Sequence, residues 1–166
     1  MPKAKHCNPL AARHKDCKGL VSEFTLRVIP AKGCAVKVMV FESRKAMDHF
    51  YKWTLERPKS VSPQTRALAS DLSYQRLGQR HDGSLVVDEV WDPRYVGLMA
   101  FMRNHLEPDT LIHECVHIGL FFARKAGQKR FFRKGDDPLD EEIAYFTSIL
   151  SCMLVKELDK RKLLPE

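Results

Sequence analysis

The chain has 166 residues, of which 44% are hydrophobic and 30% are charged, a composition typical of a folded globular domain and not of a disordered chain. No apolar run reaches the roughly 18–20 residues that a membrane-spanning helix needs, and the basic N-terminal segment lacks the apolar core of a secretory signal. We therefore expect a cytoplasmic protein without a membrane segment, with its five cysteines reduced.

The net charge of +7 is partly local, because the segment Arg124–Lys134 carries six basic residues and no acidic one. Such a segment is most simply a solvated loop after a helix. The alternative is a docking surface for an acidic partner or for nucleic acid.

The expected domain organisation is simple, with residues 1–20 as a basic, irregular N-terminal arm and residues 21–166 as a single domain. The arm contains residue types that bind zinc, but their spacing matches no common zinc motif. We therefore favour an ordinary basic arm over a second, structural zinc site built from His6, Cys7, His14 and Cys17, with Cys34 as a further candidate ligand from outside the arm.

The first half of the chain predicts a hairpin followed by a helix. Apolar and polar residues alternate in segment 23–30, which predicts a half-buried strand, and segment 35–42 reads as its partner strand. Ser43 can cap a helix over residues 44–56. Segment 59–80 contains few large apolar residues, and we expect a short helix or an inserted surface loop there.

The second half predicts two strands, over 84–91 and 95–102, followed by two helices. The first of these helices covers about 109–126, and the second covers about 138–162 with acidic residues in its first turns and basic residues in its last. The resulting order predicts an α+β fold in which a mostly antiparallel sheet packs against helices.

The most informative stretch is LIHECVHIGLFFA, residues 111–123, which is apolar except for two histidines and one glutamate. Burying a polar group without a partner costs roughly 2–7 kcal/mol. Residues four apart on a helix lie on one face, so His113 and His117 can reach the same metal ion. Glu114 is rotated by about 100° and can reach a water on that ion. This H-E-x-x-H arrangement predicts a zinc site with a glutamate as general base, in preference to two hydrogen-bonded core histidines.

A catalytic zinc site of this kind needs a third protein ligand. In the C-terminal helix, Glu141 shares a face with small residues that would allow a close approach to the HECVH helix, whereas Glu142 shares a bulkier face. We therefore favour Glu141 as the third ligand. His105 is a competing ligand that is expected to precede the helix, and both glutamates can also serve simply to complement the helix dipole.

HECVH followed by a glutamate in DEEIAY resembles the glutamate-ligand zincin metalloproteases, the gluzincins, and region 83–155 resembles the small HExxH proteins of phages and prophages. The resemblance implies a minimal zincin-like fold with Glu141 as the ligand, since a small residue, Ala144, follows three positions later. It also implies that segment 95–102 is the edge strand that holds an extended substrate. Tyr145 stands where the thermolysin-like pattern has an aspartate, and its phenol is a candidate to stabilise an oxyanion, against the alternative of a packed helix tyrosine.

Together these features predict a zinc metalloprotease acting on protein or peptide substrates. Zinc is held by His113, His117 and Glu141, and Glu114 moves a proton from a water on the metal to the leaving amine. The alternative is a catalytically inactive zincin-like binding module that contacts nucleic acid or a partner protein through its basic surface. The presence of Glu114 favours the enzyme, because a structural metal site needs no general base.

Overall fold

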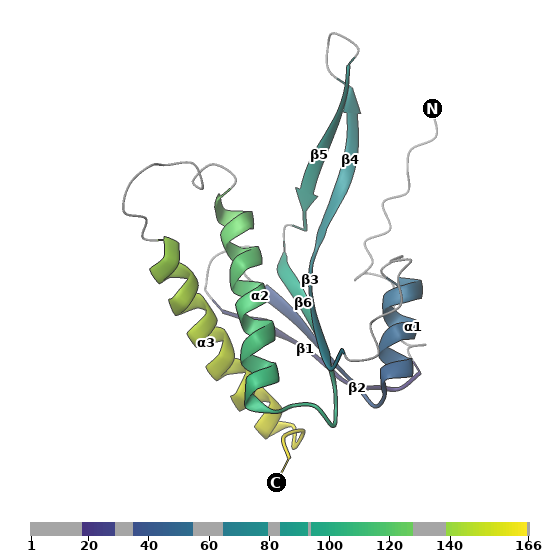
Figure 1. The fold of residues 1–166 in the computed structure, drawn as a ribbon, viewed down its shortest axis with the longest axis vertical. Coiled ribbons are helices and arrows are strands. Elements are labelled where there is room, and N and C mark those ends of the chain that lie inside the picture. Colours follow the sequence, from purple (N-terminus) through teal and green to yellow (C-terminus); the bar gives the residue numbers. More distant parts are fainter. Residues whose placement is uncertain are drawn as a thin grey trace.

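The structure is a computed structural model of the chain, and it describes residues 18–28, 35–54, 65–79, 84–92, 94–127 and 139–165. The described residues form helices and strands in the following order (Figure 1): β1 (Leu20–Arg27), β2 (Ala35–Phe41), α1 (Arg44–Thr54), β3 (Ala67–Asp71), β4 (Ser73–Gln79), β5 (Leu85–Trp91), β6 (Tyr95–Met102), α2 (Pro108–Gly127) and α3 (Leu139–Lys160). No helix among them is long and apolar enough to cross a membrane.

The main sheet has the strand order β1-β2-β6-β3 in the described part of the chain. β1 and β2 pair antiparallel, as expected of the predicted hairpin, and β3 pairs antiparallel with β6. The central pair, β2 and β6, is parallel, so the sheet is mixed. The prediction of an α+β fold with a sheet packed on helices is confirmed, with this parallel central pair as the difference.

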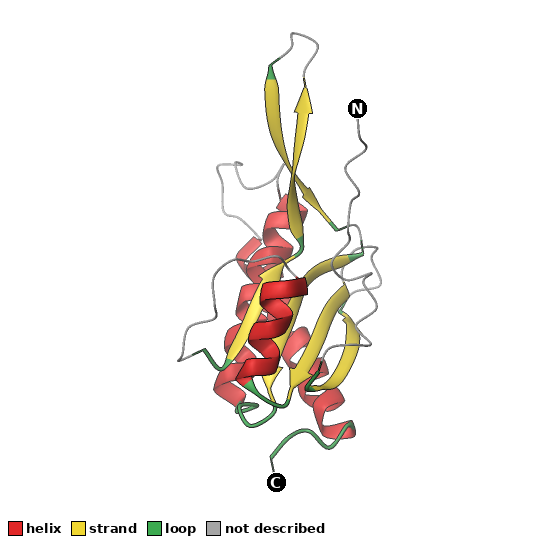
Figure 2. Cartoon of the chain, turned by 90° about the vertical axis from the view of Figure 1, so that its right-hand side faces the viewer, coloured by secondary structure: helices red, strands yellow, loops and turns green. Residues whose placement is uncertain are grey.

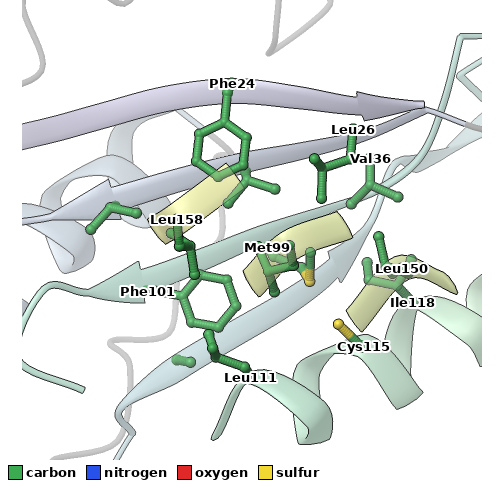
Figure 3. Packing of buried hydrophobic residues seen from close by; sticks show 14 of the residues in the cluster. Phe24, Leu26, Val36, Met99, Phe101, Leu111, Cys115, Ile118, Leu150 and Leu158 are labelled. Carbon is green, nitrogen blue, oxygen red and sulfur yellow. The ribbon is translucent and has the colours of Figure 1, made fainter. Parts of the chain in front are cut away.

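The sheet is covered on both faces, by α1 on one side and by α2 and α3 on the other (Figure 1). β2 contributes to both layers because successive strand residues point to opposite faces. Val36, Val38 and Val40 join the cluster that contains α2 and α3, and Met39 and Phe41 join the cluster that contains α1. Figure 3 shows the larger cluster, where residues of α2 and α3 meet strand residues such as Met99 and Phe101.

Segment 59–80 is where the sequence-based expectation of a helix or surface loop is wrong. Its described part contains β3 and β4. β3 has the sequence ALASD, which has little intrinsic strand propensity, and it is a strand because its backbone pairs with β6 from Ala67↔Phe101 to Asp71↔Gly97. β3 is therefore the edge strand, and β6, which we expected at the edge, lies inside the sheet between β2 and β3.

β4 and β5 form a separate two-stranded ribbon that projects from the rest of the molecule (Figure 2). It continues the β3–β6 pair, since the Asp92 N–H donates to the Leu72 carbonyl at its base. The ammonium of Lys125, near the end of α2, donates to the carbonyls of Asp92 and Tyr95 at 2.8 Å each. This lysine therefore fixes the base of the ribbon to the helix that carries the HECVH stretch.

Candidate metal centre

The HECVH helix, α2, presents different sides to the sheet, to α3 and to a pocket. Leu111, Cys115 and Ile118 are buried in the core cluster on the sheet side (Figure 3). Gly119 faces Ile143 and Thr147 of α3. The two histidines are on neither of these sides, which leaves them accessible.

His113 and His117 lie one turn apart with their Nε2 atoms 3.1 Å from each other. His113 is exposed and His117 is half-buried. Two zinc–nitrogen bonds of about 2.0–2.1 Å at a tetrahedral angle would separate the nitrogens by about 3.3 Å. The pair is therefore already close to the geometry that a shared zinc ion requires.

The surroundings of His117 lower its pKa, first through burial and then through repulsion from His113. The ring also stacks on Phe121, with ring centroids 6.5 Å apart. The lowered pKa favours the neutral imidazole, and the contact with Phe121 favours one orientation of the ring. A neutral imidazole is the form that binds a metal ion.

Glu114 is the buried acid of the stretch, with 6% of its surface exposed. Burial raises the pKa of its carboxyl group, while the nearby His113 and a hydrogen bond from the backbone N–H of Ala69 act in the opposite direction. A carboxylate with a raised pKa is a better proton acceptor near neutral pH than an ordinary glutamate. The neighbouring Cys115 thiol is unreactive by contrast, because burial raises its pKa to about 11.

An open pocket of about 630 Å³ lies between α2 and the strand β3. Both histidines and Glu114 line this pocket, so the structure brings these predicted site residues together around one solvent-accessible space. The remaining lining comes from the strand and from the first turn of α2: Thr65–Ala69, Asp109 and Thr110.

The structure does not bring Glu141 to the histidine pair. No group of three His, Cys, Asp or Glu residues in the described chain is arranged to hold a metal ion. The small-residue face that we expected to approach α2 is exposed instead, and α3 contacts Gly119 through Ile143 and Thr147. The expected close approach is therefore wrong, and Glu141 as the third ligand stays a prediction without a contact to support it.

Tyr145 also lies away from the pair, because it is 68% exposed and lies two residues, about 200° of helix, from both Ile143 and Thr147. A role in stabilising an oxyanion therefore has no support from its position. His105 precedes α2, as expected, with its Nδ1 3.6 Å from Glu107 Oε1. The Glu142 side chain lies outside the described residues, as do the N-terminal arm up to residue 17 and segment 128–138.

Sequence reasoning missed the contribution of β3, whose backbone contacts Glu114 and whose residues form one wall of the pocket. Every residue except proline has a backbone N–H, so the sequence does not indicate that the N–H of Ala69 contacts Glu114. Asp109 was also missed as a pocket residue, although its position one turn before His113 places it on the same side of the helix.

Comparisons with protein families, with curated proteins and with solved structures find no match for this chain.

Proposed function

We propose that this protein is a zinc-dependent peptidase in which His113 and His117 bind the metal ion and Glu114 is the general base. The observation that carries the proposal is the 3.1 Å separation of the two Nε2 atoms on the wall of a pocket that also holds a buried glutamate. Two hydrogen-bonded core histidines would explain neither their accessibility nor the buried acid between them.

When bound, zinc supplies a Lewis acid that polarises a carbonyl group and lowers the pKa of a water molecule. Glu114 accepts a proton from the attacking water at its carboxylate and donates that proton to the nitrogen of the leaving amine. Its raised pKa suits both transfers, because the group can hold the proton between them. Glu114 has only 6% of its surface exposed, which limits the access of other water molecules to its carboxylate.

The edge strand β3 supports a peptide as the substrate. The Arg66 carbonyl accepts a hydrogen bond from the Met102 N–H, and the Ser70 carbonyl lies against Gly97, so both point toward β6. Because backbone groups alternate along a strand, those of Ala67 and Ala69 point to the open side. An extended peptide can pair with the N–H and the carbonyl of Ala67 and with the carbonyl of Ala69 beside the histidines, as peptides do with exposed sheet edges elsewhere.

The first test is the zinc content of the purified full-length chain after zinc is supplied at neutral pH. We expect about one zinc per chain, and a clear loss in His113→Ala and in His117→Ala. His49→Ala is the matched control, because it removes an exposed histidine from α1 on the other side of the sheet. Glu141→Ala decides the third ligand: an unchanged zinc content would exclude it.

The second test is chelator-sensitive cleavage of a peptide library, with Glu114→Gln as the variant that should retain zinc and lose activity. A parent protein that binds no zinc would refute the proposal and leave the inactive binding module. For that alternative, Lys125 is already engaged with two backbone carbonyls, and the basic residues after Gly127 lie outside the described residues.

A further inference from the structure

The outward-facing backbone of β3 carries a contact that the proposed reaction has not used. The Ala69 N–H points away from β6 and donates to the carboxylate of Glu114. The N–H of Ala67 points to the same side, and the structure gives it no hydrogen-bond partner among the described residues. The two N–H groups occupy equivalent positions on the edge strand, but only that of Ala69 has a hydrogen-bond acceptor among the described residues.

We propose that the backbone N–H of Ala69 is a positioning group that holds the Glu114 carboxylate at the pocket wall beside the histidine pair. This inference rests on the proposed function for its effect on turnover. Glu114 comes from a helix and Ala69 from a strand 45 positions earlier in the chain, so the bond fixes the carboxylate against a rigid backbone. A freely rotating glutamate would lose the defined orientation that proton transfer requires.

The outward-facing N–H groups of β3 therefore have two different roles, one in holding Glu114 and one in binding a peptide. With the Ala69 N–H occupied by Glu114, the donor left for an extended peptide at this end of the strand is the N–H of Ala67. Loss of the first donor should therefore affect the chemical step, and loss of the second should affect substrate binding.

Amide hydrogen exchange of the zinc-loaded, full-length protein tests the contact without requiring activity. We expect the Ala69 amide to be protected in the parent and to exchange about tenfold faster or more in Glu114→Ala, with the amides of Leu68 and Ser70 unchanged because they pair with β6. An Ala69 amide that exchanges at the same rate with and without the Glu114 carboxylate would overturn the inference.

Kinetics of Ala69→Pro then test the consequence. Proline removes the donor, and it is tolerated in an edge strand where the N–H does not belong to the ladder. We expect unchanged zinc content, a KM within about twofold, and a kcat reduced by about 10²-fold or more, the usual contribution of a general base. Ala69→Gly keeps the N–H and should retain kcat, whereas Ala67→Pro should raise KM instead.

The outcomes separate this inference from the proposed function. A parent that cleaves no peptide, with the Ala69 amide still protected by Glu114, refutes the peptidase and retains the contact. A parent that cleaves peptides, with a folded and zinc-loaded Ala69→Pro of unchanged kcat, refutes the positioning role alone. If Ala69→Pro does not fold, the exchange measurement decides.

Discussion

Gly119 lies two residues after His117, where α2 packs on α3, and Gly119→Ala is the sharpest test of how the site helix is held. A Cβ at this position would lie closer than 3.0 Å to Thr147 Oγ1 and 3.3 Å from Ile143 Cγ2, so these side chains or the helices that carry them have to shift. Replacing glycine by alanine inside a helix gains about 1 kcal/mol of intrinsic propensity. Overpacking a tight contact costs about 1–3 kcal/mol.

The balance predicts that Gly119→Ala lowers the free energy of unfolding by about 1 kcal/mol, equivalent to a fall in Tm of about 2–4 °C for a chain of this size. Urea unfolding followed by circular dichroism measures it. Thr147→Ala should restore the loss in the double variant, because it removes the clashing atom, and this hydroxyl is buried without a hydrogen-bond partner in the described chain. A stabilised Gly119→Ala, or a double variant that shows no rescue, would refute the reasoning.

Three further predictions concern the site and the core. Because burial raises the pKa of Glu114, the folded state holds its proton more tightly than the unfolded chain, and stability is lost as the pH rises through the folded pKa. Glu114→Gln should therefore raise the Tm of the metal-free protein at pH 7, and melts below about pH 4 should show no gain. The lowered pKa of His117 keeps its ring neutral to a lower pH than that of an ordinary histidine. Zinc affinity, measured against a chelator and corrected for the protonation of the chelator, should therefore be unchanged between pH 8 and pH 7; a fall within that range would contradict this. Leu154→Ala should cost about 2–5 kcal/mol in urea unfolding because the side chain is fully buried, whereas Val155→Ala, at an exposed position, should cost far less.

The HECVH geometry follows from local sequence, because the helical repeat alone places residues four apart on one face. His113 and His117 therefore meet as predicted, and Glu114 turns aside from them as expected of the next residue along. A second local pattern, the alternation of apolar and polar residues, predicted the first strand of the β1–β2 hairpin. The boundaries of α2 and α3 agree with their predicted ranges to within two residues at each end.

Tertiary structure alone decided what surrounds that helix. ALASD becomes the edge strand because its backbone pairs with β6. The Ala69 N–H then donates a hydrogen bond to Glu114, which the residue type at position 69 could not predict. The sequence suggested that small residues on the Glu141 face of α3 would permit a close helix contact. The glycine that permits it is instead Gly119 on α2, which receives Ile143 and Thr147 and leaves Glu141 and Tyr145 in solvent. Which face of α3 packs against α2 depends on the surface of α2 as much as on α3 itself. Local sequence therefore determined the His113–His117 pair, and tertiary packing determined which residues surround it.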